Sequence, residues 1–269
     1  SEHIQTAYDL IIVGAGPAGL TAGIYANRYR IRNFIISTSI GGLINDAHKV
    51  CNYPTEPRIG GRELAKKMKR HLKEEGGSVV QDTVEEIEKE NELYKVKTAA
   101  RKEYFTKSIL LATGTKRRRL ELPHEDSLLG RGVSYCATCD GMFFQEKDVA
   151  VIGGSDAANT ASLLLAETSR KVYQIYRRGK LRGERAWVEK IKENPKIEII
   201  YNTNVLELKG KEHLQAVTLD KPYKGKDELA IEGLFIEIGS EPESKLTKEL
   251  KLKTDGFGYT TVTPDQATN

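Results

Sequence analysis

The chain alternates short apolar runs with amphipathic stretches. Residues 8–13 (Tyr-Asp-Leu-Ile-Ile-Val) are apolar, partly β-branched and followed by glycine, which predicts a buried strand. A helical pattern follows over residues 17–30, with Pro17 in the first turn, where proline is tolerated. Residues 33–37 predict a second strand. Because strand, helix and strand succeed one another within so few residues, we expect a βαβ unit in a parallel sheet.

A second unit of the same kind begins at Asp148, with a strand at 149–152, a helix at 156–169 and a strand at 172–176. Between the two units, an amphipathic helix over 62–75 precedes closely spaced strands, which we expect to pair antiparallel: 79–88, 93–98, 102–106 and 108–112. After the second unit we expect a helix at 183–193 and strands near 196–202, 204–208, 214–219 and 229–238. The pattern therefore predicts an α/β fold with two similar nucleotide-binding halves, one inside the other.

Composition narrows the classes of function. A chain of 269 residues is long enough for two cores, and 39% apolar with 30% charged residues is typical of globular proteins. The net charge is only +4, and most Lys and Arg residues alternate with Glu, which argues against a nucleic-acid partner. The one basic run, 116–119, favours a surface turn between domains, with a nucleic-acid patch as the alternative.

Location is also constrained by the sequence. No stretch approaches the roughly 20 apolar residues that a membrane span needs, so we expect no membrane partner. The first residues lack the basic-then-apolar order of a signal peptide. Three cysteines do not make an extracellular disulfide framework. These observations predict a cytoplasmic protein.

The segment Gly14-Ala-Gly-Pro-Ala-Gly19 lies between the first predicted strand and its helix. In such a loop the first glycine permits a tight turn, the second lets backbone approach a pyrophosphate, and the third lets helix pack on strand. The N–H groups of the helix start then face the anion. An acidic residue that would bind an NAD ribose is missing, since no Asp or Glu occurs between Asp9 and Asp46. Ser37, Thr38 or backbone must serve instead, which argues against NAD here and leaves FAD open.

The segment Gly153-Gly-Ser-Asp-Ala-Ala158 occupies the corresponding place in the second unit, with Ser155 where a glycine would permit the closest phosphate approach. The next strand ends in arginines: Arg177, Arg178 and Arg182. Arginines here can hold a 2′-phosphate through paired charged hydrogen bonds, whereas an acid would favour a free 2′-hydroxyl. We therefore expect NADPH at this loop, with NADH as the alternative, and a solvated basic turn as the structural alternative.

Cys136-Ala-Thr-Cys139, followed by Asp140, is the candidate reactive centre. Zinc needs about four ligands. Cys51 is the only other cysteine, and no pair of histidines has the spacing of zinc ligands, so we expect no metal site. Two residues between the sulfurs allow reversible disulfide closure and a lowered thiol pKa. The pair lies just before the second nucleotide loop, which predicts a redox disulfide. Asp140 is a candidate proton donor, with capping of the following turn as its structural alternative.

In combination these motifs resemble low-molecular-weight thioredoxin reductase, from Tyr8 to about Thr263. The segments that carry the resemblance are 14–19, 41–42, 52–54, 112–114, 136–140, 153–158, 177–182 and 238–242. The resemblance implies a FAD domain (1–116 and 241–269) interrupted by an NAD(P)H domain with the redox cysteines (117–240). It also implies homodimerisation, a swivelling NADPH domain, and thioredoxin or a glutaredoxin-like protein as disulfide substrate.

The resemblance also assigns roles to individual residues. Cys139 would face the flavin, Cys136 would attack the partner's disulfide, and Asp140 would act as the acid. The implied FAD contacts are Gly14, Ala15, Gly16, Pro17, Ala18, Gly19, Ser37, Gly41, Gly42, Asn52, Val84, Thr113 and Gly114. The implied NADPH contacts are Gly153, Ser155, Asp156, Ala157, Arg177, Arg178 and Arg182.

The chain departs from this family at Leu43, where Gln is usual, at Ser155, and at its last residues. The family continues into an Ala-Gly-Asp segment that holds FAD, so we expect a FAD domain that is incomplete at its C-terminal end. Two alternatives follow. One is a related flavin disulfide reductase with another donor (NADH or a deazaflavin) or acceptor, and the other is an inactive dinucleotide-binding protein.

Overall fold

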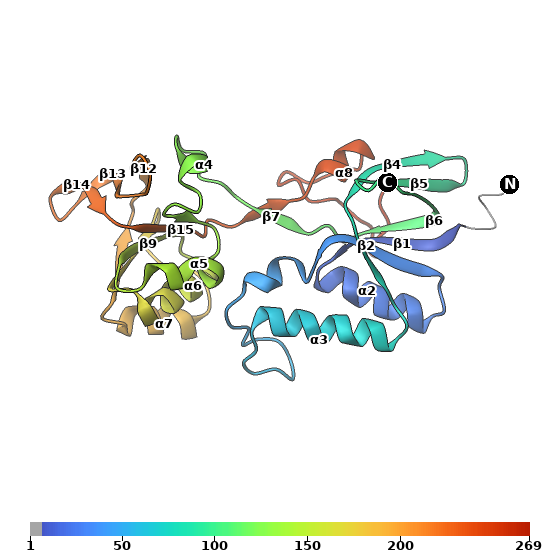
Figure 1. The fold of residues 1–269 in the computed structure, drawn as a ribbon, viewed down its shortest axis with the longest axis horizontal. Helices are drawn as coiled ribbons and strands as arrows, with labels where there is room; N and C mark the ends of the chain where they lie inside the picture. The colour runs from blue at the N-terminus through green and yellow to red at the C-terminus, as the bar shows by residue number, and fades with distance from the viewer. Residues whose placement is uncertain (1–6) are drawn as a thin grey trace. The chain divides into compact units, whose positions relative to one another are not determined.

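The computed structural model describes residues 7–269, which form two compact units (Figure 1). The first unit contains the described residues up to Asn45 together with 50–116 and 241–269, and the second contains 46–49 and 117–240. Each unit is an α/β layer structure with its own parallel strands. The predicted fold class, two Rossmann-like units with one inserted in the other, is therefore confirmed. Within the described residues, no helix is long and apolar enough to cross a membrane.

The first unit is built on one six-stranded sheet with the order β3-β2-β1-β6-β5-β4. Its strands are β1 (Tyr8–Ala15), β2 (Asn33–Ile40), β3 (Val79–Gln81), β4 (Val84–Glu90), β5 (Leu93–Thr98) and β6 (Glu103–Leu111). In this sheet, β3, β2, β1 and β6 are parallel neighbours, whereas β6, β5 and β4 are antiparallel neighbours. An antiparallel meander thus extends a parallel nucleotide-binding sheet.

Side-chain alternation along β1 builds two cores in this unit. Ile12 packs on one face with residues of α2 (Pro17–Arg28) and α3 (Gly61–Glu74). Ile11 packs on the opposite face with the meander and with α8 (Lys245–Glu249). Both isoleucines are fully buried, and residues 10–13 of β1 are all apolar because both faces of the strand are covered there. Figure 1 shows the two long helices together on one side of the sheet.

The second unit has a five-stranded parallel sheet with the order β11-β10-β9-β15-β8. These strands are β8 (Val133–Ser134), β9 (Asp148–Ile152), β10 (Lys171–Tyr176), β11 (Ile197–Tyr201) and β15 (Gly233–Ile236). Its longer helices are α6 (Asp156–Thr168) and α7 (Arg185–Glu193). An antiparallel sheet of this unit contains β12 (Val205–Lys209), β13 (Ala216–Tyr223) and β14 (Lys226–Ala230).

The remaining elements of the chain are short. Strand β7 (Thr115–Arg117) pairs with β16 (Ser240–Pro242). The short helical turns are η1 (Gly42–Asp46), α4 (Glu125–Leu128), α5 (Ala137–Asp140) and η2 (Gly141–Phe144).

The structure corrects the bounds of four expected strands. Residues 102–106 and 108–112 form one strand, β6, because exposed Lys107 simply continues the alternation after buried Thr106. The expected strand 79–88 is divided in two, and its first part, β3, pairs parallel with β2. The division falls at Asp82, whose Oδ1 accepts hydrogen bonds from Thr83 N and Ala100 N. Residues 229–238 also form two strands, since the chain changes partner at Glu232, whose N–H donates to Asp148 O.

Candidate functional site

The first glycine loop joins the end of β1 to the start of α2. A Cβ on Gly14, which has φ of +107°, would lie 2.2 Å from Ala112 O, and a Cβ on Gly19 would lie 1.8 Å from Gly14 O. Packing within the protein therefore requires both glycines. A Cβ on Gly16 would have no neighbour closer than Gly41 O at 4.0 Å. Because open space lies over Gly16 at the start of a twelve-residue helix, the loop fits a bound pyrophosphate.

Two further loops of the first unit lie beside this one. Gly41 and Gly42 have φ of +100° and +58°, and a Cβ on Gly42 would be 3.4 Å from the Cα of Gly16. On the other side, Ala112 N donates to Val13 O at 2.8 Å, which places Thr113 and Gly114 next to the end of β1. The structure thus brings the predicted contacts at 14–19, 41–42 and 113–114 to one edge of the sheet.

Three other predicted FAD contacts, Ser37, Val84 and Asn52, lie outside these three loops. Ser37 lies on β2, and its hydroxyl donates to Ser39 O at 2.7 Å. Val84 follows Thr83, whose hydroxyl oxygen lies 3.2 Å from that of Thr38. The Val84 side chain is buried in the core, so only its backbone could contact a ligand. Asn52 is exposed in the loop that precedes α3.

The second glycine loop joins β9 to α6. Gly153 has φ of +143°, and a Cβ there would lie 2.2 Å from Glu237 O, so this turn also requires glycine. Ser155 is the N-cap residue of α6, with ordinary extended backbone and no side-chain capping bond. Its hydroxyl is therefore available to an anion at the helix start. Asp156 and exposed Ala157 form the first turn, and Ala158 is fully buried against the core.

A basic turn follows β10. The predicted residues Arg177, Arg178 and Arg182 are exposed, and within residues 7–269 their guanidinium groups form no ion pair. A groove of about 820 Å³ is lined by two of them, Arg178 and Arg182, but not by Arg177. Sequence reasoning missed three further cations of this groove: Lys180, Arg185 and Lys192. The spacing of seven between Arg185 and Lys192 on one helix face could have indicated the last two.

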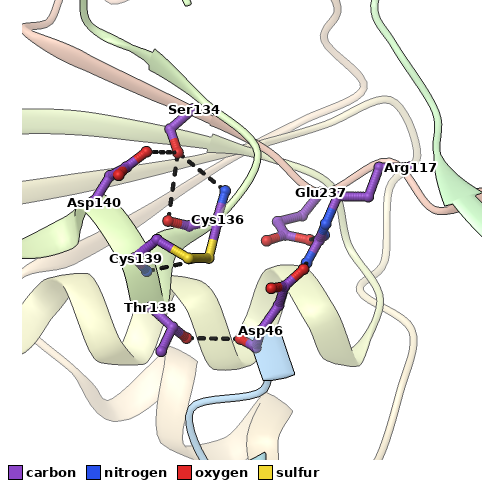
Figure 2. The surroundings of a disulfide bond; sticks show 8 residues. All are labelled: Asp46, Arg117, Ser134, Cys136, Thr138, Cys139, Asp140 and Glu237. Atoms are coloured by element: carbon purple, nitrogen blue, oxygen red, sulfur yellow. Dashed lines mark hydrogen bonds and ion pairs between the residues drawn. A yellow bond between two sulfur atoms is a disulfide. The ribbon is translucent and has the colours of Figure 1, made fainter. Parts of the chain in front are cut away.

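The candidate reactive centre lies at the start of α5. Cys136 and Cys139 form a disulfide with Cα atoms 5.3 Å apart (Figure 2). Cys136 is the N-cap residue, and its Sγ accepts a hydrogen bond from Cys139 N at 3.1 Å. This N–H would also stabilise a thiolate at Cys136 after reduction. The third cysteine, Cys51, is exposed and belongs to the other unit.

Ser134 holds this centre together, and sequence reasoning missed it. Its buried hydroxyl donates to Asp140 Oδ2 at 2.6 Å and accepts from Cys136 N at 3.0 Å (Figure 2). Asp140 makes no side-chain capping bond, so the alternative role as a cap of the following turn is not seen. No sequence motif marks Ser134, because its role depends on β8 lying beside the helical turn.

A buried carboxylate lies near the disulfide in Figure 2. Glu237 Oε2 accepts from Arg117 Nη1 at 2.7 Å, and Arg117 Nη2 donates to Asp46 Oδ2 at 3.1 Å. Thr138 Oγ1 donates to Asp46 O at 2.7 Å. Burial raises the pKa of Glu237 to about 7, although the charge of Arg117 opposes this shift. Desolvation wins because the Glu237 side chain is only 7% exposed.

This shift predicts a pH dependence of stability. A carboxyl whose pKa is raised on folding stabilises the folded state below its unfolded pKa, near 4.5, and loses that contribution as pH rises through about 7. Between these limits the free energy of unfolding of the wild type should fall relative to Glu237→Gln, by up to about 3 kcal/mol. Urea unfolding from pH 4.5 to 7.5 measures the difference. Parallel curves for the two proteins would contradict the shift.

The sequence comparisons identify the family. Residues 8–269 match the profile of the family "Pyridine nucleotide-disulphide oxidoreductase". The chain is 34% identical to a thioredoxin reductase of Peptoclostridium acidaminophilum, over 99% of this chain and 87% of that protein. It is 37% identical to a thioredoxin reductase of Treponema pallidum, over 94% of this chain and 83% of that protein.

Solved structures agree with the sequence relatives. The thioredoxin reductase of Lactococcus lactis superposes with a TM-score of 0.92 at 35% identity, covering 97% of this chain and 87% of that one. The thioredoxin reductase of T. acidophilum gives a TM-score of 0.90 at 31% identity, covering 98% and 87%. Together with the two glycine loops and the Cys136–Cys139 disulfide, these matches show that the chain belongs to the pyridine nucleotide-disulphide oxidoreductases, among the low-molecular-weight thioredoxin reductases.

Proposed function

We propose that the protein is a thioredoxin-disulfide reductase that uses NADPH and FAD to keep the Cys136–Cys139 pair reduced. The observation that carries the proposal is the disulfide itself, placed at the N-cap of α5 with Asp140 held beside it by Ser134. A redox pair in such a turn can open and close without a change of fold. Thioredoxin is the proposed substrate, and a glutaredoxin-like protein is the other protein class that the same chemistry fits.

The chain's own residues account for the exchange with the partner. After reduction, the Cys136 thiolate attacks one sulfur of the partner disulfide, so that the partner's S–S bond breaks and a mixed disulfide forms. Cys139 then attacks the Cys136 sulfur, which restores the Cys136–Cys139 bond and releases the partner as a dithiol. The roles are assigned this way because Cys136 Sγ receives the N–H of Cys139.

Asp140 is the proposed proton donor for this centre. The two partner sulfurs leave as thiolates in these two steps and need protons. Ser134 Oγ is 2.6 Å from Asp140 Oδ2 and also bonded to Cys136 N. The serine therefore fixes the carboxyl with respect to the cysteine turn, and we assign it as a positioning residue.

FAD is assigned to the first unit and NADPH to the second. The open space over Gly16, with Gly41–Gly42 and Thr113–Gly114 beside it, fits a dinucleotide whose ribose meets no carboxylate on β2. In the second unit, Ser155 faces the same kind of helix start, and the basic groove after β10 supplies cations for a 2′-phosphate. Bound FAD would supply the two-electron relay between NADPH and the disulfide.

Homodimerisation and a cytoplasmic location complete the proposal. A reversible disulfide that must be reduced in each cycle suits a reducing compartment. A dimer is expected from the resemblance to the family, and sedimentation of the purified protein would measure it.

The proposed function is tested by an anaerobic assay. Protein incubated with FAD and oxidised thioredoxin should form two thioredoxin thiols for each NADPH consumed at 340 nm. A Cys136→Ser, Cys139→Ser double variant, which retains both glycine loops, should form none. Consumption of NADPH without thioredoxin thiols, or equal thiol formation by the double variant, would overturn the proposal.

A further inference from the structure

Two fully buried amide side chains, Asn159 and Gln174, lie between the second glycine loop and the basic turn. Gln174 Nε2 donates to Gly153 O at 3.2 Å and to Asn159 Oδ1 at 2.9 Å. Asn159 Nδ2 donates to Arg182 O at 3.0 Å. Because a buried amide without partners is costly, this chain of bonds favours one arrangement of strand β10, helix α6 and the turn that carries Arg182.

Residues 177–184, the basic turn, contain neither helix nor strand. Buried Leu181 and the hydrogen bond from Asn202 N to Arg178 O at 3.2 Å fix the middle and the start of this turn. It is held to α6 and its loop at two further points. Arg182 N donates to Gly154 O at 2.6 Å, and Glu184 N donates to Asp156 Oδ1 at 2.8 Å. Gly183 has φ of +113°, and a Cβ there would lie 2.1 Å from Asp156 Oδ1. The turn therefore fits its place only with glycine at 183.

We propose that Asn159, supported by Gln174, is a positioning residue for recognition of the nucleotide's 2′-phosphate. Asn159 holds the Arg182 backbone over the nucleotide loop, so that the guanidinium meets a 2′-phosphate while the pyrophosphate lies at Gly153–Ser155. The inference rests on the proposed nucleotide assignment of this unit. It adds that the preference for NADPH depends on residues that themselves touch no part of the nucleotide.

The test compares two probes that differ only in the 2′-phosphate, 2′,5′-ADP and 5′-AMP, by titration calorimetry on the full chain. Asn159→Leu removes the hydrogen bonds to Arg182 O and from Gln174 Nε2. Because Arg182 O is then left unpaired, the Kd of 2′,5′-ADP should rise about tenfold. The Kd of 5′-AMP should stay within about twofold, because the loop that receives the 5′-phosphate is unchanged. The ratio of kcat/KM for NADPH and NADH should fall by the same factor as the 2′,5′-ADP affinity.

Three further variants make the outcome decisive. Ser162→Ala is the matched control, since this buried hydroxyl on the same helix has no hydrogen-bond partner, and it should change neither Kd. Arg182→Ala should lose the preference for 2′,5′-ADP directly. Gly183→Ala disturbs the same contacts from the exposed side, because its methyl group would press on Asp156 Oδ1 and lie 3.2 Å from Asn159 Nδ2. It should reproduce the selective loss, which keeps the test open if Asn159→Leu does not fold.

The results separate this inference from the proposed function. If Arg182→Ala loses the preference but Asn159→Leu and Gly183→Ala keep it, the positioning role is overturned while the nucleotide assignment stands. An equal loss of both probes in Asn159→Leu would indicate a merely structural role and would also overturn the inference. If the wild type binds the two probes equally, the nucleotide assignment fails and the positioning role fails with it.

Discussion

The Cys139→Ser variant, reduced and then mixed with oxidised thioredoxin, is expected to remain covalently joined to it. Its Cys136 can attack the partner disulfide, but the Cys139 thiol that would release the mixed disulfide is missing. The Cys139 backbone N–H, which donates to Cys136 Sγ at 3.1 Å, is kept in this variant. Non-reducing electrophoresis should show most of the protein as a 1:1 adduct, and catalytic turnover should fall by at least about a thousandfold.

The matched variant is Cys136→Ser. It keeps Cys139, the same turn and the exposed thiol of Cys51, yet should trap far less thioredoxin because the attacking sulfur is gone. Cys51→Ser in both backgrounds shows that the adduct does not form through the third cysteine. Equal trapping by Cys136→Ser and Cys139→Ser would contradict the assigned order of attack.

The fold was largely predictable because its first layer is local. In β1-α2-β2 the apolar strand, Pro17 at the helix start and the apolar run at 33–37 lie within forty residues, and the observed elements agree with them to within a few positions. The errors fall where strand pairing changes over a few residues. At Glu232 the chain changes neighbour, but apolar residues lie on both sides of the short Glu-Gly interruption. Periodicity alone carries no information on the strand's partner.

The candidate site was predictable where a motif places its own residues side by side. The loops at 14–19 and 153–158 and the pair Cys136–Cys139 are of this kind. Ser134, Asn159 and Gln174 are not, because each acts through a side chain that meets another element: Asp140, Arg182 O and Gly153 O respectively. The only signal in the sequence would be a polar residue at a position that is buried in the fold. A single sequence does not show which face of a strand is buried, because a shift of one residue in register exchanges the two faces.

Replacing Gly16 by Ala is expected to abolish tight FAD binding while leaving the FAD-free fold intact. The added methyl group meets no protein atom closer than 4.0 Å, and Gly16 has an ordinary φ of −72°. The free energy of unfolding without FAD should therefore change by less than about 1 kcal/mol. The methyl group does occupy the space in which a pyrophosphate would approach the start of α2. Loss of the charged hydrogen bonds there should raise the Kd of FAD by at least about a hundredfold, as measured by quenching of flavin fluorescence.

Gly19→Ala, three residues along the same loop, is the contrasting variant. Its methyl group would lie 1.8 Å from the backbone oxygen of Gly14, which cannot move without separating helix α2 from strand β1. The expected loss is about 3 kcal/mol or more of unfolding free energy without FAD, seen in urea unfolding, with weaker FAD binding as its consequence. Of the two variants, only Gly16→Ala should therefore separate cofactor binding from stability. A Gly16→Ala protein that binds FAD like the wild type would remove this loop from the cofactor site, because nothing within the protein itself requires glycine at that position.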